Sequence, residues 1–304
     1  MHDADISLLK VFIAVVQSGS FSGAQAILNI SPSTISEHMS RLETRLGMRL
    51  CHRGRAGFRL TSQGQSIYDS AQRLMSAIEL FKHEAGALKN RLSGEFRLGL
   101  IGNTITDLSS PVRAALEAFS SRDGDVSLRV DIGSPIELEQ QLLDGRLHLV
   151  IGTFPLKVAG IDYHLLYEES EGLYCGKNHP LFVKNDVGID EIKEHKIAGR
   201  GYMKAKDVAL LNSYKASATV DNVEAQALLI HTGKYIGLLP NHYADLWVKK
   251  GEMRRILPEE IAPSSPFEYA VRQSKSISYV VKVFIEDLNT FACRFNGSTP
   301  SNEI

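Results

Sequence analysis

Hydrophobic positions near the start of the chain recur at the spacing of short amphipathic helices. In the segment 31–46, apolar side chains separated by four, three and four positions share one helical face: Ile35, Met39, Leu42 and Leu46. Ser31 can cap this helix, and Pro32 follows at the first helical position, where its missing N–H is tolerated. Two more helices are predicted upstream, near 6–18 and 20–28. Three helices joined by such short links predict a helix-turn-helix domain.

The opposite face of the predicted helix 31–46 is small and polar. It carries side chains that can form hydrogen bonds: Ser33, Ser36, Glu37, Ser40 and Arg41. Such a face suits the major groove of DNA, where base edges are read through hydrogen bonds. The pattern therefore indicates a nucleic acid as a partner of this chain.

After residue 47 the pattern changes to short apolar-flanked segments around Gly54 and Gly57, which predicts a hairpin. Between positions 41 and 59 there are six arginines and one acid. Residues 1–92 carry 11 basic and 7 acidic side chains, whereas residues 93–304 carry 23 and 28. The net charge of −1 thus hides a basic end of the kind that contacts phosphates.

A heptad pattern of apolar residues follows the hairpin without a break. Its members are Ile67, Ala71, Leu74, Ile78, Phe81, Ala85, Leu88 and Leu92. A seam this regular favours a partner helix, and packing of the helix on its own domain is the alternative. We expect the helix to pair two chains, which implies two half-sites in an interrupted palindromic operator.

These elements together resemble the LysR-type transcriptional regulators. The residues that carry the resemblance are Phe12, Gly19-Ser20-Phe21, Ala24-Gln25, Leu28, Ser31, Ser36, Leu42-Glu43, Leu46-Gly47, Leu50, Arg53, Leu60-Thr61 and Gly64. The resemblance implies a winged helix-turn-helix, a homodimer formed through the linker helix, and an effector domain similar to periplasmic binding proteins. It also implies dimers of dimers, RNA polymerase as a further partner, and no catalysis.

Carried over position by position, the resemblance places a recognition helix at about 32–46 and a wing in the hairpin. The positions expected to face DNA are Pro32, Ser33, Ser36 and His38 of the helix, and Arg53 and Arg55 of the wing. The chain departs from the family where Pro32 replaces a common glutamine, Glu37 a frequent arginine, and Cys51 a usual phenylalanine.

Glu37 and Arg41 complete the predicted DNA-binding set, and Glu37 has two interpretations. Its carboxylate can accept a hydrogen bond from cytosine N4. It can instead pair with Arg41, four residues on, as an ordinary helix salt bridge. The sequence leaves both open.

Residues 93–304 alternate strands and helices in a β-α-β-α-β run, which predicts a parallel sheet with right-handed crossovers. The predicted fold is an all-α winged helix-turn-helix domain, a long linker helix and an α/β two-lobed effector domain. Their expected bounds are 1–61, 62–92 and 93–304, with lobe I at about 93–166 and 267–304 and lobe II at about 167–266.

Ligands in such folds bind at the carboxyl ends of strands, next to helix N-termini. The candidate effector-binding residues are Asn103, Thr104, Ser134 and Thr153 in lobe I, and Arg200, Tyr202 and Asn222 in lobe II. For each polar residue the alternative is a helix cap or turn that touches no ligand. Arg200 lies between two glycines, which suggests a carboxylate effector held by a bidentate pair; the alternative is an arginine on a surface loop.

Other classes of protein find little support. The sequence has no run of eighteen apolar residues, so no membrane span is predicted. The first residues lack the apolar core of a signal peptide. The three cysteines and ten histidines show no metal-binding spacing, so we expect no metal, no cofactor and reduced thiols in the cytoplasm. An enzyme of Rossmann-like fold would need a glycine fingerprint that 99–102 does not supply. A solute-binding protein would have a signal peptide and would not need wing arginines.

Overall fold

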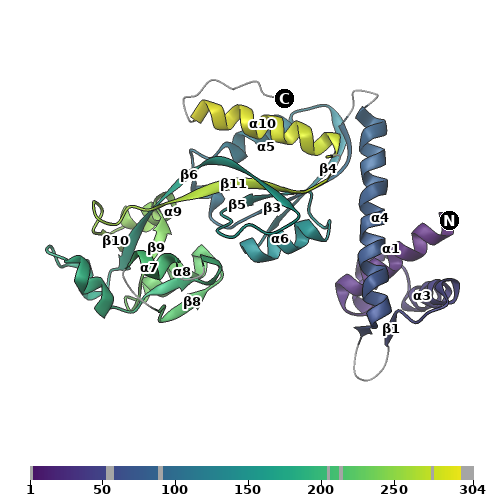
Figure 1. Cartoon of the computed structure of the whole chain (residues 1–304), viewed down its shortest axis with the longest axis horizontal. Helices are drawn as coiled ribbons and strands as arrows, with labels where there is room; N and C mark the ends of the chain where they lie inside the picture. Colours follow the sequence, from purple (N-terminus) through teal and green to yellow (C-terminus); the bar gives the residue numbers. More distant parts are fainter. Residues whose placement is uncertain are drawn as a thin grey trace. The chain divides into compact units, whose positions relative to one another are not determined.

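The computed structural model describes residues 3–52, 58–87, 92–203, 206–211, 215–274 and 277–295. Contacts divide the chain into two compact units, Met1–Phe81 and Lys82–Ile304 (Figure 1). Within the described residues, no helix is both long and apolar enough to cross a membrane.

The first unit contains three short helices, a two-stranded hairpin and most of one long helix. These elements are α1 (Asp3–Ser18), α2 (Phe21–Leu28), α3 (Pro32–Leu46), β1 (Cys51–His52), β2 (Arg59–Leu60) and α4 (Ser62–Ala87). The predicted cap of α3 is confirmed, because Ser31 Oγ accepts a hydrogen bond from Thr34 N at 3.2 Å. The predicted apolar face is also confirmed, since Ile35, Met39 and Leu42 are buried in the core of this unit.

Glu43 and Thr61 fasten the hairpin to the helices. Glu43 Oε1 accepts hydrogen bonds from the backbone N–H of Leu50 at 2.8 Å and of Cys51 at 3.3 Å. Thr61 Oγ1 donates to the carbonyl of Arg49 and accepts from Gly64 N, both at 2.8 Å, so it also begins α4. The wing tip, with the predicted DNA contacts Arg53 and Arg55, lies outside the described residues.

The long helix α4 forms as predicted, and the exposure of its seam residues rises along the helix. Ile67 packs against the core of the first unit and Ala71 is buried, while Leu74 and Ile78 are half-exposed and Phe81 is 69% exposed. Leu88 and the side chain of Ala85 lie outside the described residues.

The assignment of Leu92 to the seam was wrong. The described part of α4 ends at Ala87, and Leu92 begins strand β3, where it is 7% exposed within the core of the second unit. Its heptad spacing continues the pattern only in sequence, because a strand cannot extend the seam of a helix.

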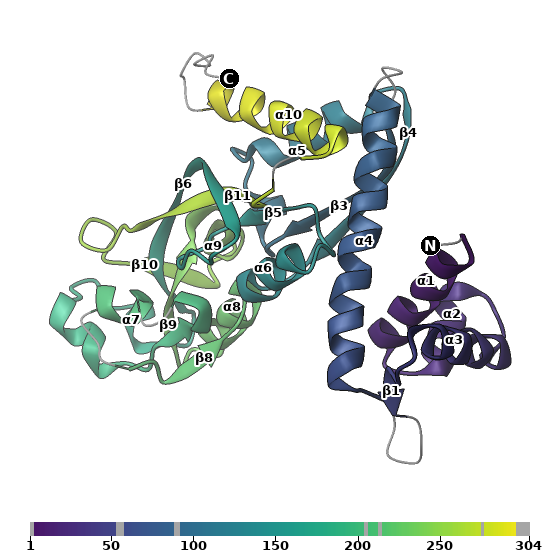
Figure 2. The same cartoon turned by 45° about the vertical axis from the view of Figure 1, so that its right-hand side comes forward.

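The second unit is a two-lobed α/β domain (Figure 2). Lobe I is built mainly from β3 (Leu92–Leu100), η1 (Thr104–Thr106), α5 (Pro111–Ser120), β4 (Gly124–Ile132), α6 (Pro135–Leu143), β5 (Leu149–Gly152) and α10 (Tyr279–Phe295). Strand β3 lies between β4 and β5 and is parallel to both, as the β-α-β-α-β pattern predicted. Helices α5 and α10 cover one face of this sheet and α6 the other (Figure 1).

Two long antiparallel strands, β6 (Ile161–Gly176) and β11 (Ser264–Arg272), run from lobe I into lobe II. The last residues of β6 pair with β9 (Ile236–Pro240) and β10 (Met253–Ile256). The remaining elements of lobe II are η2 (Pro180–Phe182), η3 (Ile189–Glu194), β7 (Ala198–Arg200), η4 (Gly201–Met203), α7 (Lys206–Leu210), β8 (Ala218–Val220), α8 (Val223–His231) and α9 (Asn241–Val248).

The close approach of α4 to the hairpin predicts that Gly64→Ala destabilises the first unit. An added Cβ would lie 1.9 Å from the carbonyl oxygen of Leu50, so backbone must shift. We expect a loss of about 1–3 kcal/mol in the free energy of unfolding of this unit, measured by hydrogen exchange of α1–α3 in urea. Gln63→Ala, at the exposed neighbouring position, is the control; equal stability of the two variants would contradict the packing described.

Candidate DNA-binding surface and effector site

The outer face of α3 presents the predicted DNA contacts to solvent. Pro32, Ser33, Glu37 and Arg41 are exposed, whereas Ser36 and His38 are half-buried and lie at the edge of this face. Ser33 Oγ is hydrogen-bonded to the cap Ser31 Oγ at 2.7 Å. Ser31 and Gly47 cap the two ends of α3, and the exposed polar side chains on its outer face remain available for contact with DNA.

Glu37 does not pair with Arg41 in this structure. Both side chains are described and exposed, and no ion pair joins them. The salt-bridge interpretation therefore has no support from the geometry. A carboxylate that is free on this face remains able to accept a hydrogen bond from a base.

In lobe I, two predicted effector residues have polar atoms that are enclosed but unpaired. Asn103 follows β3 with φ +66°, and its Nδ2 is buried with no hydrogen-bond partner among the described residues. Thr153 follows β5 and is 4% exposed, and its Oγ1 likewise lacks a partner in the part of the chain that is described. Thr104 Oγ1, in contrast, donates to the carbonyl of Ile101 at 3.0 Å.

Ser134 and Asn222 act as helix caps, which was the alternative for both. Ser134 forms a reciprocal capping box with Glu137 at the start of α6. Asn222 Oδ1 accepts a hydrogen bond from Ala225 N at 2.8 Å and begins α8. Their polar groups are therefore already engaged by the backbone that they terminate.

Arg200 does not lie free in a ligand site, and the prediction that it clamps a carboxylate effector was wrong. It is 3% exposed, and its guanidinium donates to both carboxylate oxygens of Glu171, at 3.1 and 2.6 Å. It donates further to Asp207, from Nε at 2.9 Å and from Nη2 at 2.9 Å. Tyr202, also buried, has its ring 5.8 Å from this guanidinium. Glu171 and Asp207 thus occupy the guanidinium N–H groups of Arg200 that a carboxylate ligand would need for a bidentate contact.

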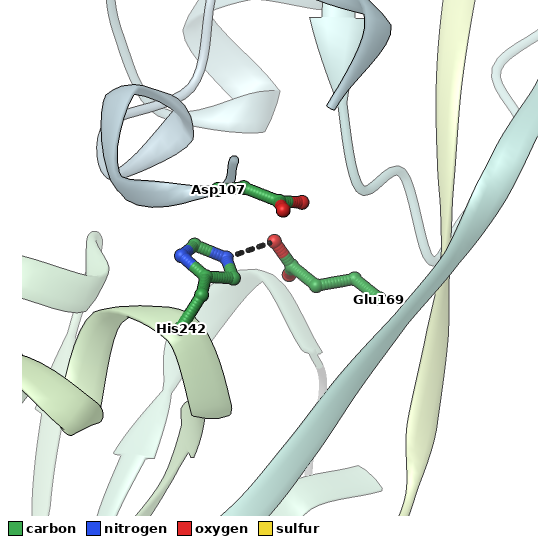
Figure 3. Close-up of side chains that lie close together, drawn as sticks. All are labelled: Asp107, Glu169 and His242. Atoms are coloured by element: carbon green, nitrogen blue, oxygen red, sulfur yellow. Dashed lines mark hydrogen bonds and ion pairs between the residues drawn. The ribbon is translucent and has the colours of Figure 1, made fainter. Parts of the chain in front are cut away.

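A second cluster of polar side chains, two of them buried and His242 half-buried, lies where the lobes join, and the sequence did not indicate it. Asp107 follows η1 in lobe I, Glu169 lies on the crossing strand β6, and His242 lies on α9 in lobe II (Figure 3). One ligating atom of each lies within 4.8 Å of the others, and His242 Nε2 is 3.0 Å from Glu169 Oε1.

Comparison with known proteins defines the class. The bacterial regulatory helix-turn-helix protein model of the lysR family matches residues 6–65, and the LysR substrate binding domain model matches residues 89–292. The chain therefore belongs to the LysR family of transcriptional regulators, has a helix-turn-helix and an effector-binding domain, and is not an enzyme.

Similar individual proteins cover nearly the whole chain. The HTH-type transcriptional activator BauR of Pseudomonas aeruginosa is 38% identical over 291 residues, which cover 94% of this chain and 95% of that protein. The LysR family regulator CbnR has a similar structure, with a TM-score of 0.65 at 19% identity over 96% of this chain and 99% of that one. A full-length OxyR variant from Pseudomonas aeruginosa has a TM-score of 0.66 at 19% identity, with both chains covered completely.

The ion-pair network predicts that Arg200→Ala lowers the stability of the second unit. The change leaves Glu171 and Asp207 buried without a cation, which costs about 3–5 kcal/mol. Unfolding of this unit in urea, followed by hydrogen exchange of β6 and β11, measures the effect. Arg129→Ala removes a pair whose arginine side chain is 63% exposed, and we expect a change of at most about 1 kcal/mol. Equal losses in the two variants would contradict a structural role for Arg200.

Proposed function

We propose that this regulator binds an interrupted palindromic operator as a homodimer and activates transcription in response to a small-molecule effector. The observation that carries the proposal is the exposed polar face of α3, capped by Ser31 and backed by a buried apolar face. BauR is named a transcriptional activator, and this supports activation rather than repression as the effect of the present regulator. We place its action in the cytoplasm, where bacterial DNA lies.

Side chains on α3 have distinct roles in this proposal. Ser33, Ser36, Glu37 and His38 lie near base edges, and Glu37 accepts from an exposed cytosine amino group. Arg41 contacts a phosphate, since it is exposed and carries a charge that no described acid neutralises. Arg53 and Arg55 add wing contacts, as the family resemblance implies. Base contacts then provide specificity and phosphate contacts provide affinity.

The exposed part of α4 supports the dimer. Leu74, Ile78 and Phe81 continue along one stripe of the helix beyond Ile67, which packs against the core of the first unit. A large aromatic side chain that is 69% exposed on such a stripe favours burial against a second helix.

The effector, in this proposal, contacts Asn103 and Thr153 at the carboxyl ends of β3 and β5, with Thr104 beside them. The enclosed amide of Asn103 and hydroxyl of Thr153 have no partner among the described residues, which supports hydrogen bonding to a ligand. Because Arg200 is neutralised by Glu171 and Asp207, the effector class is not restricted to carboxylates.

Arg41→Ala tests the recognition helix. We expect weaker binding to genomic fragments selected by the wild-type protein, and a salt dependence of log K reduced by about 1, as for one lost phosphate contact. Lys10→Ala on α1 removes the same charge at another exposed position of this unit and serves as the matched control. Equal losses in both variants would mean that the effect is one of net charge rather than of the α3 face.

Phe81→Asp tests the dimer stripe. A carboxylate within a helix–helix seam is desolvated without a partner, so we expect the dimer dissociation constant to rise at least about tenfold. Analytical ultracentrifugation measures it, and operator affinity should fall in parallel. Ser66→Asp places the same charge on α4 outside the stripe; a wild-type oligomer for Phe81→Asp would remove α4 as the interface.

A further inference from the structure

Three side chains of the kinds that bind metal ions meet where the two lobes join. Figure 3 shows the carboxylates of Asp107 and Glu169 and the imidazole of His242 directed toward one another. One oxygen or nitrogen of each lies within 4.8 Å of the others, and both carboxylate residues are buried. They come from three elements, and Glu169 and His242 are 73 positions apart in the sequence. Because of this separation, the spacing of histidines and cysteines along the chain did not predict a metal site.

The distances between the donor atoms suit a small divalent ion. Zn²⁺ binds imidazole nitrogen and carboxylate oxygen at about 2.0–2.2 Å, so two ligands of a tetrahedral ion lie roughly 3.3–3.6 Å apart. His242 Nε2 and Glu169 Oε1 are 3.0 Å apart. The Asp107 oxygen, within 4.8 Å of both, needs to approach by at most roughly 1.5 Å. Three protein ligands leave a fourth position for water, and the nearby Tyr167 hydroxyl is enclosed without a hydrogen-bond partner among the described residues.

The buried charges around this cluster favour a cation. Asp107 and Glu169 are 8% and 4% exposed, and no described lysine or arginine forms an ion pair with either. The buried guanidinium of Arg200 is shared between two other buried carboxylates, Glu171 and Asp207. A neutral imidazole adds no charge. Two ionised carboxylates that are buried this close together are costly unless a positive charge lies between them.

A hydrogen bond outside the donor set orients the imidazole. A histidine that binds a metal ion through one ring nitrogen usually donates the N–H of the other to an acceptor. His242 Nδ1 lies 2.7 Å from Thr106 Oγ1, and this hydroxyl can accept because its own hydrogen reaches the carbonyl of Asn103 at 2.8 Å. With the hydrogen on Nδ1, the lone pair of Nε2 is free for an ion. Without an ion, the other tautomer donates from Nε2 to Glu169, so binding requires only a change of tautomer.

We propose that Asp107, Glu169 and His242 bind one divalent transition-metal ion of the Zn²⁺ type, which holds lobe II against lobe I. The imidazole nitrogen favours such an ion over Mg²⁺ and Ca²⁺, which prefer oxygen ligands. The site is separate from the proposed effector contacts, because none of its three ligands is among them. Since the ligands come from both lobes and from the strand that crosses between them, the ion favours the arrangement in which the lobes meet.

Isothermal titration calorimetry of the full chain with Zn²⁺, after removal of metal ions with EDTA, tests the site. We expect the wild type to bind one ion per chain with high affinity. Thr106→Val removes only the acceptor of the His242 N–H, so the dissociation constant should rise by about 10–100-fold. His242→Gln and Glu169→Gln each remove a ligand and should weaken binding at least as much. Zn²⁺ should also increase the hydrogen-exchange protection of segments 101–110 and 236–248 in the wild type but not in His242→Gln.

His164→Gln is the matched control, since His164 is exposed on the same strand as Glu169, and it should keep the wild-type affinity. Thermal unfolding in EDTA shows which variants are folded; should His242→Gln fail to fold, Thr106→Val still tests the site, because it keeps all three ligands. No binding of Zn²⁺ by the wild type, or equal affinities in the wild type and all variants, would overturn the site and assign any binding to surface histidines. Tighter binding of Mg²⁺ than of Zn²⁺ would overturn the choice of ion.

Discussion

The architecture of the effector domain depends on neutralising charges where β6 and β11 cross between the lobes. Glu171 of β6 is buried there, and Ser265 of β11 donates to it at 2.9 Å. Arg200 supplies the compensating charge and links both to Asp207 at the start of α7. A buried arginine with two carboxylates is stable only while all members remain in place, so the network fixes lobe II relative to the strands that carry it.

The ion pairs of Arg200 also determine which hydrogen-bond partners remain for the polar side chains around it. The guanidinium is committed to two carboxylates, so Glu169, two residues along β6, relies on His242 of the other lobe. Among the predicted effector residues of lobe II, Arg200 and Asn222 already have their polar groups engaged, by ion pairs and by a helix cap. The enclosed polar atoms without a described partner that were predicted for a ligand lie in lobe I, on Asn103 and Thr153. Of the predicted effector residues, Asn103 and Thr153 are therefore the ones whose polar groups stay open to a ligand.

Sequence patterns succeeded where the cause of structure is local. Ser31 caps α3 through Thr34, three residues on, and the parallel sheet of lobe I follows from alternating strands and helices. They failed where partners are distant in sequence. Arg200 between two glycines looks like a loop residue, but one of its carboxylate partners is 29 residues away. The contact of Glu169 with His242 spans 73 residues, and only the folded sheet brings them together. The assignment of Leu92 to the helix seam failed for a different reason, because heptad spacing does not indicate where a helix ends.

Asn103 connects the proposed effector contacts to the lobe contact. Its side-chain Nδ2 has no partner among the described residues, while its carbonyl accepts a hydrogen bond from the Thr106 hydroxyl, which lies 2.7 Å from His242 Nδ1. Asn103 also holds a left-handed conformation at φ +66°, which most side chains disfavour and asparagine tolerates. In the proposed function, a ligand that moves Asn103 would change the orientation of Thr106 and hence of the His242 ring that meets Glu169. These two hydrogen bonds form a direct link from the proposed effector contacts of lobe I to α9 of lobe II, and a ligand could bias the position of lobe II through it only by binding one arrangement of the lobes more tightly than the other.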